Sequence, residues 1–337
     1  MQLNFSSLKS LLSVPKKIVL TSHTNPDGDA VGASLAMFLF LKNQGHKVKV
    51  ILPNAFPEYL AWMEGSDQIK LYEKDKAACD KLFASADILF SLDYNHPNRI
   101  GDAEQSFVRS KAVKILIDHH VQPKIDAYNH VFSTVETSST SELVFDCIMA
   151  LSPDAMTKPI AECIYTGIMT DTGSFSYACN NEKTFRIVAD LYKAGINGVK
   201  INRLVYNTFS ESRLRLLGYA LSEKLRVLPE YATAYIYLTT EELNRFNYQV
   251  GDTEDVVNYA LSIKGVRFAA MFIERDKKIR VSLRSVGDFK VNTIAREYFE
   301  GGGHKNAAGG DSFLTMEKTL EKFEQLLPAY KKELTEK

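Results

Sequence analysis

The sequence predicts an α/β protein: an N-terminal domain with a mainly parallel sheet and helices on both faces, a helical linker, and a smaller C-terminal α/β domain. Three observations support this. Short β-branched runs alternate with helical patterns over the first two hundred residues, as in parallel sheets covered by helices. A chain of 337 residues exceeds the size at which single cores stop growing. A second α/β pattern follows a charged helical stretch. We place the domains at 1–195 and 229–337, with the linker at 196–228.

The elements of the first domain follow from apolar patterning. The expected strands are Lys17–Thr21, Lys47–Leu52, Asp87–Leu92 and Val113–Ile117, with a helix over Ala30–Asn43 between the first two. Runs such as Ile88-Leu89-Phe90 are apolar throughout, as expected of strands buried on both faces. Leucines recurring at intervals of three or four predict a helical connection over Thr184–Val227.

The sequence pattern of the second domain predicts strands and a helix. Ala232–Leu238, Val266–Ile273 and Ile279–Leu283 are expected strands, and Thr315–Lys332 an amphipathic closing helix. The charged segment Glu274–Lys278 predicts a hairpin turn between the last two strands.

Composition excludes several classes of protein. The chain balances 41 Lys plus Arg against 41 Asp plus Glu, so bulk charge does not favour long duplex DNA or a membrane surface. No apolar run approaches the roughly 18–20 residues that span a bilayer, and the N-terminus lacks a secretory apolar core. The four cysteines lack C-x-x-C spacing, so neither disulfides nor a thiolate metal site is indicated. We therefore expect a cytoplasmic protein.

Acidic and histidine side chains follow several of the expected elements. The box His23–Asp29 follows the first strand, Asp93 and Asp118-His119-His120 follow two others, and Asp171 follows an apolar stretch. Side chains at the carboxyl ends of parallel strands share one crevice, and clustered carboxylates are costly unless cations neutralise them. Oxygen-rich ligation without thiolates favours Mn²⁺ or Mg²⁺, and two such ions suit phosphate ester hydrolysis.

The second domain carries a different chemical segment. The run Gly301–Gly310 contains three adjacent glycines that let backbone N–H groups approach an anion, followed by His304 and Lys305. Strand alternation puts Ser282 and Arg284 on one face of a neighbouring strand, where the guanidinium could bind phosphate or stack on a base.

Together these motifs resemble the DHH/DHHA1 phosphoesterase family over nearly the whole chain. The His23–Asp29 box, Asp93, the Asp118-His119-His120 triplet and Asp171-Thr172-Gly173 stand in the family's order, and Gly301–Gly310 resembles the DHHA1 signature. The compact two-domain length is most similar to the NrnA type. That resemblance implies hydrolysis of short oligoribonucleotides (nanoRNA) to mononucleotides, and removal of the 3′-phosphate of 3′-phosphoadenosine 5′-phosphate to give AMP.

The resemblance also implies roles for individual residues. One Mn²⁺ would be held by His23, Asp27 and Asp93, and a second by Asp29, Asp93, His119 and Asp171, with Mg²⁺ or Co²⁺ as substitutes. The implied catalytic residues are Asp93 as the bridge, His120 at the scissile phosphate and Asp118 as an orienting group. The implied substrate contacts are Arg99, Ser282, Arg284, Gly301, Gly302, Gly303 and His304.

Three alternatives stay open at this stage. The enzyme could instead be an exopolyphosphatase or pyrophosphatase, or a linear or cyclic dinucleotide phosphodiesterase. It could also be an inactive nucleotide-binding module, although Gly28-Asp29-Ala30-Val31-Gly32 lacks the G-x-G core of a dinucleotide turn.

Residues 256–310 carry ten Lys plus Arg against five Asp plus Glu, a local excess of 10 − 5 = +5. We expect short RNA and small phosphorylated nucleotides as partners, with a homodimer left open.

Overall fold

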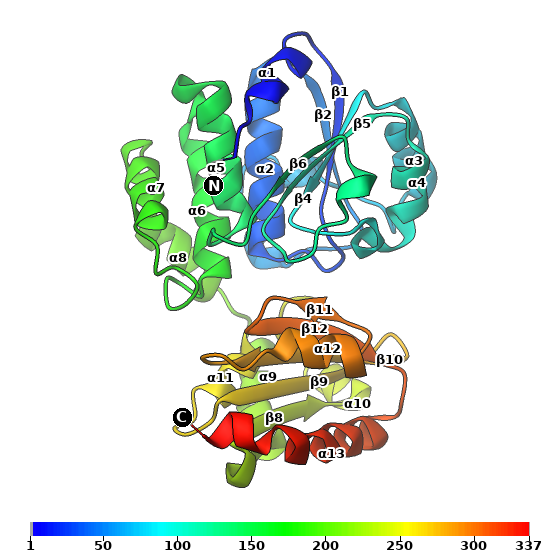
Figure 1. The fold of residues 1–337 in the computed structure, drawn as a ribbon, viewed down its shortest axis with the longest axis vertical. Helices are drawn as coiled ribbons and strands as arrows, with labels where there is room; N and C mark the ends of the chain where they lie inside the picture. The colour runs from blue at the N-terminus through cyan, green and yellow to red at the C-terminus, as the bar shows by residue number, and fades with distance from the viewer. Residues whose placement is uncertain (1–2, 337) are drawn as a thin grey trace. The chain divides into compact units, whose positions relative to one another are not determined.

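The computed structural model describes residues 3–336 and divides into two compact units, Met1–Thr208 and Phe209–Lys337. The first unit contains a six-stranded sheet of order β3-β2-β1-β4-β5-β6, in which neighbouring strands are parallel (Figure 1). Its strands are β1 (Lys17–Thr21), β2 (Lys47–Leu52), β3 (Lys70–Leu71), β4 (Ile88–Leu92), β5 (Val113–Asp118) and β6 (His130–Ser133). Their carboxyl ends therefore meet at one edge of the sheet.

Helices cover both faces of this sheet, as the sequence predicts. One core joins the sheet to α2, α5 and α6, and a second core joins it to α3 and α4 (Figure 1). The helices are α1 (Ser6–Leu11), α2 (Gly28–Asn43), α3 (Lys76–Ser85), α4 (Glu104–Arg109), α5 (Thr140–Leu151), α6 (Lys158–Asp171), α7 (Glu182–Lys193) and α8 (Gly198–Tyr206). The four cysteines are buried free thiols.

The second unit contains a mixed six-stranded sheet of order β11-β12-β10-β9-β8-β7, in which β8 and β9 are parallel and the other neighbours antiparallel. Its strands are β7 (Leu225–Leu228), β8 (Thr233–Leu238), β9 (Phe268–Arg275), β10 (Lys278–Ser285), β11 (Gly302–Gly303) and β12 (Ala307–Ser312). Its helices are α9 (Glu211–Tyr219), α10 (Thr240–Arg245), α11 (Val256–Leu261), α12 (Val291–Tyr298) and α13 (Met316–Thr335). The predicted α/β class is confirmed for both units.

Several elements differ from the prediction. The helical stretch expected up to Val227 ends earlier, because Leu225–Leu228 pairs with β8 as an edge strand, and leucine spacing alone does not separate these outcomes. No strand was predicted over the glycine run, but the structure forms β11 and part of β12 there. The hairpin turn is tighter than expected, with Asp276 and Lys277 in left-handed conformations (φ 57° and 61°). The short edge strands β3 and β6 carry too little pattern to be predicted.

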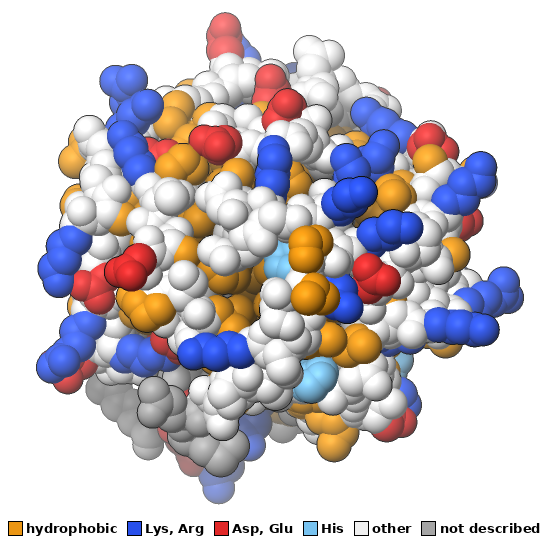
Figure 2. All heavy atoms as spheres, turned by 90° about the horizontal axis from the view of Figure 1, so that it is seen from above, with side chains coloured by type: hydrophobic (Ala, Val, Ile, Leu, Met, Phe, Trp, Pro, Cys, Tyr) orange, Lys and Arg blue, Asp and Glu red, His pale blue; other side chains and the backbone are white. Residues whose placement is uncertain are grey.

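The surface carries charges of both signs. On the face shown in Figure 2, Lys and Arg side chains are interspersed with Asp and Glu side chains, in keeping with the balanced composition. Among the described residues, no helix combines the length and apolarity needed to cross a membrane.

Close packing of α2 against α6 positions the functional edge of the first sheet. Gly32 on α2 faces the α6 backbone, and a Cβ atom at this position would lie 2.5 Å from the Cys163 carbonyl oxygen and 3.1 Å from the Gly167 nitrogen. Gly167 in turn packs against Ser141 of α5 and Asp29 of α2. The two glycines thus let three helices converge where Asp29 and Asp171 lie.

We expect Gly32→Ala to lower the free energy of unfolding by about 2 kcal/mol, because the added methyl group would push against backbone that cannot rotate away. Urea unfolding monitored by circular dichroism measures this. Gly218→Ala is the control, since Gly218 lies in α9 and a Cβ atom added there would meet no other atom within 4 Å. It should be neutral or stabilising by up to ~1 kcal/mol through helix propensity. Equal effects of the two changes would contradict the packing argument.

Candidate metal centre

The loop after β1 places His23 and Asp27 together at the carboxyl edge of the sheet. Asp27 is the N-cap of α2, and its Oδ1 accepts hydrogen bonds from the backbone N–H groups of Asp29 (3.0 Å) and Ala30 (3.1 Å). Its other oxygen, Oδ2, lies 4.0 Å from His23 Nε2. The N-cap hydrogen bonds therefore fix one carboxylate oxygen and aim the other at the histidine.

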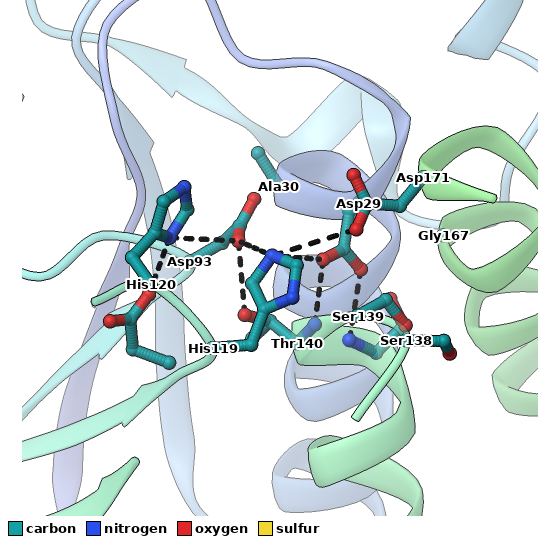
Figure 3. Close-up of polar contacts among 12 residues, drawn as sticks. Asp29, Ala30, Asp93, His119, His120, Ser138, Ser139, Thr140, Gly167 and Asp171 are labelled. Atoms are coloured by element: carbon teal, nitrogen blue, oxygen red, sulfur yellow. Dashed lines mark hydrogen bonds and ion pairs between the residues drawn. The ribbon is translucent and has the colours of Figure 1, made fainter. Parts of the chain in front are cut away.

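Asp93 lies at the centre of the cluster and directs its two oxygens toward different groups. It follows β4 in a left-handed conformation (φ 66°) and is 2% exposed. Its Oδ2 lies 3.4 Å from His23 Nε2. Its Oδ1 lies 3.4 Å from His119 Nε2 and 3.8 Å from His120 Nδ1 (Figure 3). This geometry is what a carboxylate shared between two sites requires.

Asp29 and Asp171 complete a second group from the helices α2 and α6. His119 Nε2 lies 3.9 Å from Asp29 Oδ2 and 3.5 Å from Asp171 Oδ2. Two sets of three residues thus bring their potential ligand atoms within 4.8 Å of one another. The sets are His23, Asp27 and Asp93, and Asp29, His119 and Asp171. The structure brings together all six residues that we predicted as ligands.

Asp118 and His120 form a separate pair beside Asp93. Asp118, the last residue of β5, is fully buried, and its Oδ1 lies 2.7 Å from His120 Nδ1. When Nδ1 carries the proton of this hydrogen bond, the bond fixes the tautomer of the ring, and Nε2 is left for a different partner. The buried Asp118 carboxylate thus restricts the orientation of the His120 ring.

Residues at the start of α5, none of them among the predicted site residues, hold the carboxylates in place. The backbone N–H groups of Thr140 and Ser141, at the start of α5, donate to Asp29 at 2.7 and 2.9 Å. The Thr140 hydroxyl also donates to Asp93 Oδ1 at 3.0 Å (Figure 3). A usable signal existed, because Ser139 followed three residues later by Glu142 is a helix-start pattern.

Burial and mutual repulsion shift the pKa values of the cluster. Burial raises the pKa of Asp29 well above its usual range, and the charges of Asp93 and Asp171 raise it further. Burial likewise raises the pKa of Asp171 to about 6, although His119 opposes this. Burial also disfavours charge on Asp93, but hydrogen bonds from His119 and His23 hold its pKa well below the usual range. In the metal-free cluster, burial and repulsion thus disfavour charge on Asp29, whereas hydrogen bonds from the two histidines favour charge on Asp93.

The donor set fits hard or borderline divalent cations. It consists of carboxylates and imidazoles without a thiolate, a composition suited to Mn²⁺ or Mg²⁺. Asp29 and Asp93 are 1% and 2% exposed and lie beside Asp171, so cations would relieve a repulsion that the fold otherwise maintains. The two ligand sets could therefore hold divalent metal ions.

The remaining predicted residue of the first unit is Arg99. It lies in the short 3₁₀ segment Pro97–Ala103, and its carbonyl accepts a hydrogen bond from the Thr24 N–H at 2.8 Å. Burial acts to lower the pKa of His23, but Asp93 and Asp27 raise it overall, and the positive charge of Arg99 acts against them. Arg99 is exposed and within electrostatic range of the metal centre.

The predicted substrate residues of the second unit lie on adjacent strands. Ser282 of β10 pairs with Gly309 of β12, which pairs with Gly302 of β11, so the three form a row across the sheet. Arg284 follows two residues along β10, on the same face as Ser282. The other predicted substrate residues, Gly301, Gly303 and His304, lie beside Gly302 along the chain.

The glycines also have a structural role in the sheet. A Cβ atom at Gly301 would collide with the Gly309 carbonyl oxygen, and Gly303 adopts φ 137°, which favours glycine. The His304 N–H donates to the Ala307 carbonyl at 2.7 Å in the turn between β11 and β12. The glycine run thus allows the backbones of β11 and β12 to approach closely.

We expect Asp171→Asn to stabilise the metal-free protein at pH 7.5. A carboxyl whose pKa rises on folding binds its proton more tightly when folded, so stability falls as the pH rises from about 4 through about 6. Above that pH range, a pKa shift of this size lowers the free energy of unfolding by ~1–3 kcal/mol. The neutral Asn side chain avoids this loss of stability. Thermal unfolding in EDTA should give a higher Tm for D171N at pH 7.5 and little difference at pH 4. The exposed Asp154→Asn is the control, and an unchanged or lower Tm for D171N at pH 7.5 would refute the argument.

Comparisons with known proteins agree with the geometry. The model of the DHH family N-terminal domain matches residues 17–168, and that of the DHHA1 domain matches residues 230–336. The bifunctional oligoribonuclease and PAP phosphatase NrnA of Thermus thermophilus is 28% identical, with 96% of this chain and 92% of that protein aligned. The NrnA protein of Bacillus subtilis is 26% identical, with 90% and 91% aligned.

Solved structures extend the comparison. A crystal structure of an exopolyphosphatase-related protein from Bacteroides fragilis is 46% identical, with a TM-score of 0.92 and coverage of 98% of this chain and 97% of that one. The Mn²⁺ complex of RecJ from Thermus thermophilus shares the fold at 13% identity, with a TM-score of 0.53 over 98% of this chain and 54% of RecJ. With both domain types, their order and the clustered motif residues in place, this chain belongs to the DHH/DHHA1 family of phosphoesterases.

Proposed function

We propose that this protein is a Mn²⁺-dependent phosphoesterase that hydrolyses short oligoribonucleotides to mononucleotides and removes the 3′-phosphate of 3′-phosphoadenosine 5′-phosphate. The observation that carries the proposal is Asp93, whose two oxygens lie 3.4 Å from His23 and 3.4 Å from His119 in separate ligand sets. The relatives named NrnA support the choice of substrates.

The metal assignment follows the two sets. His23, Asp27 and Asp93 would hold one ion, and Asp29, Asp93, His119 and Asp171 the other, with Mg²⁺ or Co²⁺ able to replace Mn²⁺. Two such ions would supply an activated water and neutralise charge on the phosphoryl group. The protein's part is to hold the carboxylates in position, which the hydrogen bonds from the start of α5 to Asp29 and Asp93 support.

His120 and Arg99 would act on the phosphoryl group itself, with Asp118 orienting His120. The bond from Asp118 holds His120 in one orientation, so that its Nε2 can hydrogen-bond the phosphoryl oxygen or protonate the leaving ester oxygen. Arg99 offers a planar cation for a non-bridging phosphate oxygen. Both roles need groups held before substrate arrives, because reorganisation during reaction would raise the barrier.

The second unit would bind the part of the substrate that does not react. Ser282 can donate a hydrogen bond to phosphate, and Arg284 can form two parallel ones or stack on a base. The backbone at Gly301, Gly302 and Gly303 offers N–H groups without side-chain obstruction, and His304 adds a further donor. A dinucleotide and 3′-phosphoadenosine 5′-phosphate would satisfy the same contacts, since each joins a nucleotide to a second phosphoryl group.

A second candidate function is hydrolysis of polyphosphate. The 46% identical Bacteroides fragilis protein is described as exopolyphosphatase-related, which favours including this activity. Polyphosphate would use the metal centre and the cationic contacts but not base stacking.

The test is a substrate panel with purified protein and Mn²⁺. We expect release of mononucleotides from di- to pentaribonucleotides and of phosphate from 3′-phosphoadenosine 5′-phosphate, measured by chromatography. Pyrophosphate and polyphosphate are the competing arms, and Asp93→Asn is the metal-site control, expected to lose at least about 10²-fold in kcat because the shared ligand is weakened. Polyphosphate hydrolysis without either nucleotide activity would replace the proposed function with the second candidate.

For the second unit, we expect Arg284→Gln to raise KM for the dinucleotide pApA about tenfold, because the substitution removes one charged hydrogen bond to the substrate. Its rate on bis(p-nitrophenyl) phosphate should stay unchanged, because that substrate carries no nucleotide for this surface to bind. Steady-state kinetics measures both. Arg296→Gln, on an exposed position of α12, is the matched control. An unchanged KM for pApA would remove Arg284 from the substrate site.

A further inference from the structure

Glu142 is a fully buried carboxylate next to the metal centre, and its contacts lie outside the ligand sets. Its side chain is 0% exposed. Oε2 accepts hydrogen bonds from the Ser138 hydroxyl (2.7 Å) and N–H (3.3 Å) and from the Thr184 hydroxyl (2.8 Å). Oε1 lies 3.1 Å from Lys183 Nζ. A charge buried this deeply is tolerated only when it is well paired, so these contacts depend on one another.

Two of these partners belong to the first turn of α7. Lys183 also pairs with Asp146 Oδ2 of α5 at 2.6 Å, and Thr184 is fully buried. Burial acts to raise the pKa of Glu142, but the Ser138 bond, the Lys183 charge and the Thr184 bond hold it below the usual range. The amino end of α7 is therefore attached to α5 through an ionised Glu142.

The same turn of α5 carries the donors to the metal ligands. Ser139 caps the helix by accepting the Glu142 N–H at 3.1 Å. The intervening Thr140 and Ser141 N–H groups bind Asp29, and the Thr140 hydroxyl binds Asp93. A shift of Glu142 would move these donors, because all four residues belong to one helical turn.

A second connection joins α7 to the metal centre along the chain. Asp171 ends α6, and residues 172–181 lead directly to α7. This segment holds Ser174, Phe175 and Ala178 in left-handed conformations, with φ of 57°, 64° and 52°. Such conformations are unfavourable for residues other than glycine, so the segment depends on favourable contacts, which include the hydrogen bond from the Phe175 N–H to Thr172 Oγ1 and the ring contact of Phe175 with Tyr165.

We propose that Glu142 is a positioning residue through which docking of α7 and binding of divalent metal at Asp29 and Asp93 stabilise each other. The inference rests on the metal centre of the proposed function and adds residues outside that centre. Because such coupling is reciprocal, metal should fasten α7 as much as docked α7 strengthens metal binding. Lys183 and Thr184 thereby act on the metal site from another helix.

The first test measures Mn²⁺ affinity by isothermal titration calorimetry of the full chain. Glu142→Gln keeps the size of the side chain but presents an amide to Lys183, and we expect its Kd for Mn²⁺ to rise about tenfold, as for other groups that orient metal ligands. Thr184→Val, which removes a single hydrogen bond, should raise Kd by a smaller factor. Asp190→Asn is the matched control: it makes the same acid-to-amide change on α7, but Asp190 pairs with Lys193 and is 47% exposed. Its Kd should stay within about twofold of wild type, since it contacts no group that orients a ligand.

The second test measures hydrogen exchange of α7 with and without Mn²⁺. We expect Mn²⁺ to slow exchange over Glu182–Lys193 in the wild type and in D190N, and to have little effect there in E142Q. This readout does not depend on activity, and circular dichroism in EDTA checks that each variant is folded. If E142Q does not fold, the T184V variant carries both measurements.

The outcomes distinguish the coupling from the metal centre itself. Wild-type Mn²⁺ affinity in folded E142Q and T184V, with unchanged protection of α7, would overturn the coupling and leave the metal centre intact. Absence of Mn²⁺ binding by the wild type would overturn both. Weakened binding in E142Q and T184V but not in D190N, together with the loss of metal-dependent protection in E142Q, would support the coupling.

Discussion

The structure of the first unit depends on one electrostatic constraint, the crowding of buried carboxylates around Asp93. Asp29, Asp93 and Asp118 are at most 2% exposed and cannot all be charged without compensation. Compensation comes from His23, His119 and His120 and from the N–H groups at the start of α5. These partners set which carboxylates stay ionised, and they leave a group of oxygens suited to divalent cations.

The fold supplies this arrangement by simple means. Parallel strands bring the residues after β1, β4 and β5 to one edge of the sheet. The helices then contribute the rest: α2 brings Asp29, α6 brings Asp171 and α5 brings its N-terminal donors. Their convergence depends on Gly32 and Gly167, where larger side chains would separate the helices. The chemistry of the site and the packing of the core therefore depend on the same helices, and Glu142 extends this dependence to α7.

In the proposed function, the second unit would recognise a phosphorylated ligand on a sheet. Ser282 and Arg284 stand on β10 beside two strands made largely of small residues, so side chains do not obstruct the backbone there. A row of hydrogen-bonding groups next to bare backbone suits an anion. Within a chain of no net charge, carboxylates cluster around Asp93 in the first unit, whereas residues 256–310 of the second unit carry ten Lys plus Arg against five Asp plus Glu.

Much of the fold and of the site could be predicted from the sequence, because the signals are local. Apolar runs marked β1, β2, β4 and β5, and each polar residue after a strand end pointed to the shared edge. His23, Asp27, Asp93 and His119 come together there accordingly, whereas Asp29 and Asp171 reach them from helices. The glycine run illustrates the limit, since its sequence indicated no strand, while pairing of β12 with β10 and β11 made it part of a sheet.

What the sequence by itself determined is which residue types reach the functional edge. The tertiary structure decided which atoms face one another: the split of the Asp93 oxygens between two histidines, the hold of Thr140 and Ser141 on Asp29, and the link from Glu142 to α7. Asp29 and Thr140 lie 111 residues apart in the chain, so no local pattern records their hydrogen bond. Such contacts are set by the packing of helices against the sheet, because direction and distance between side chains exist only once the core has formed.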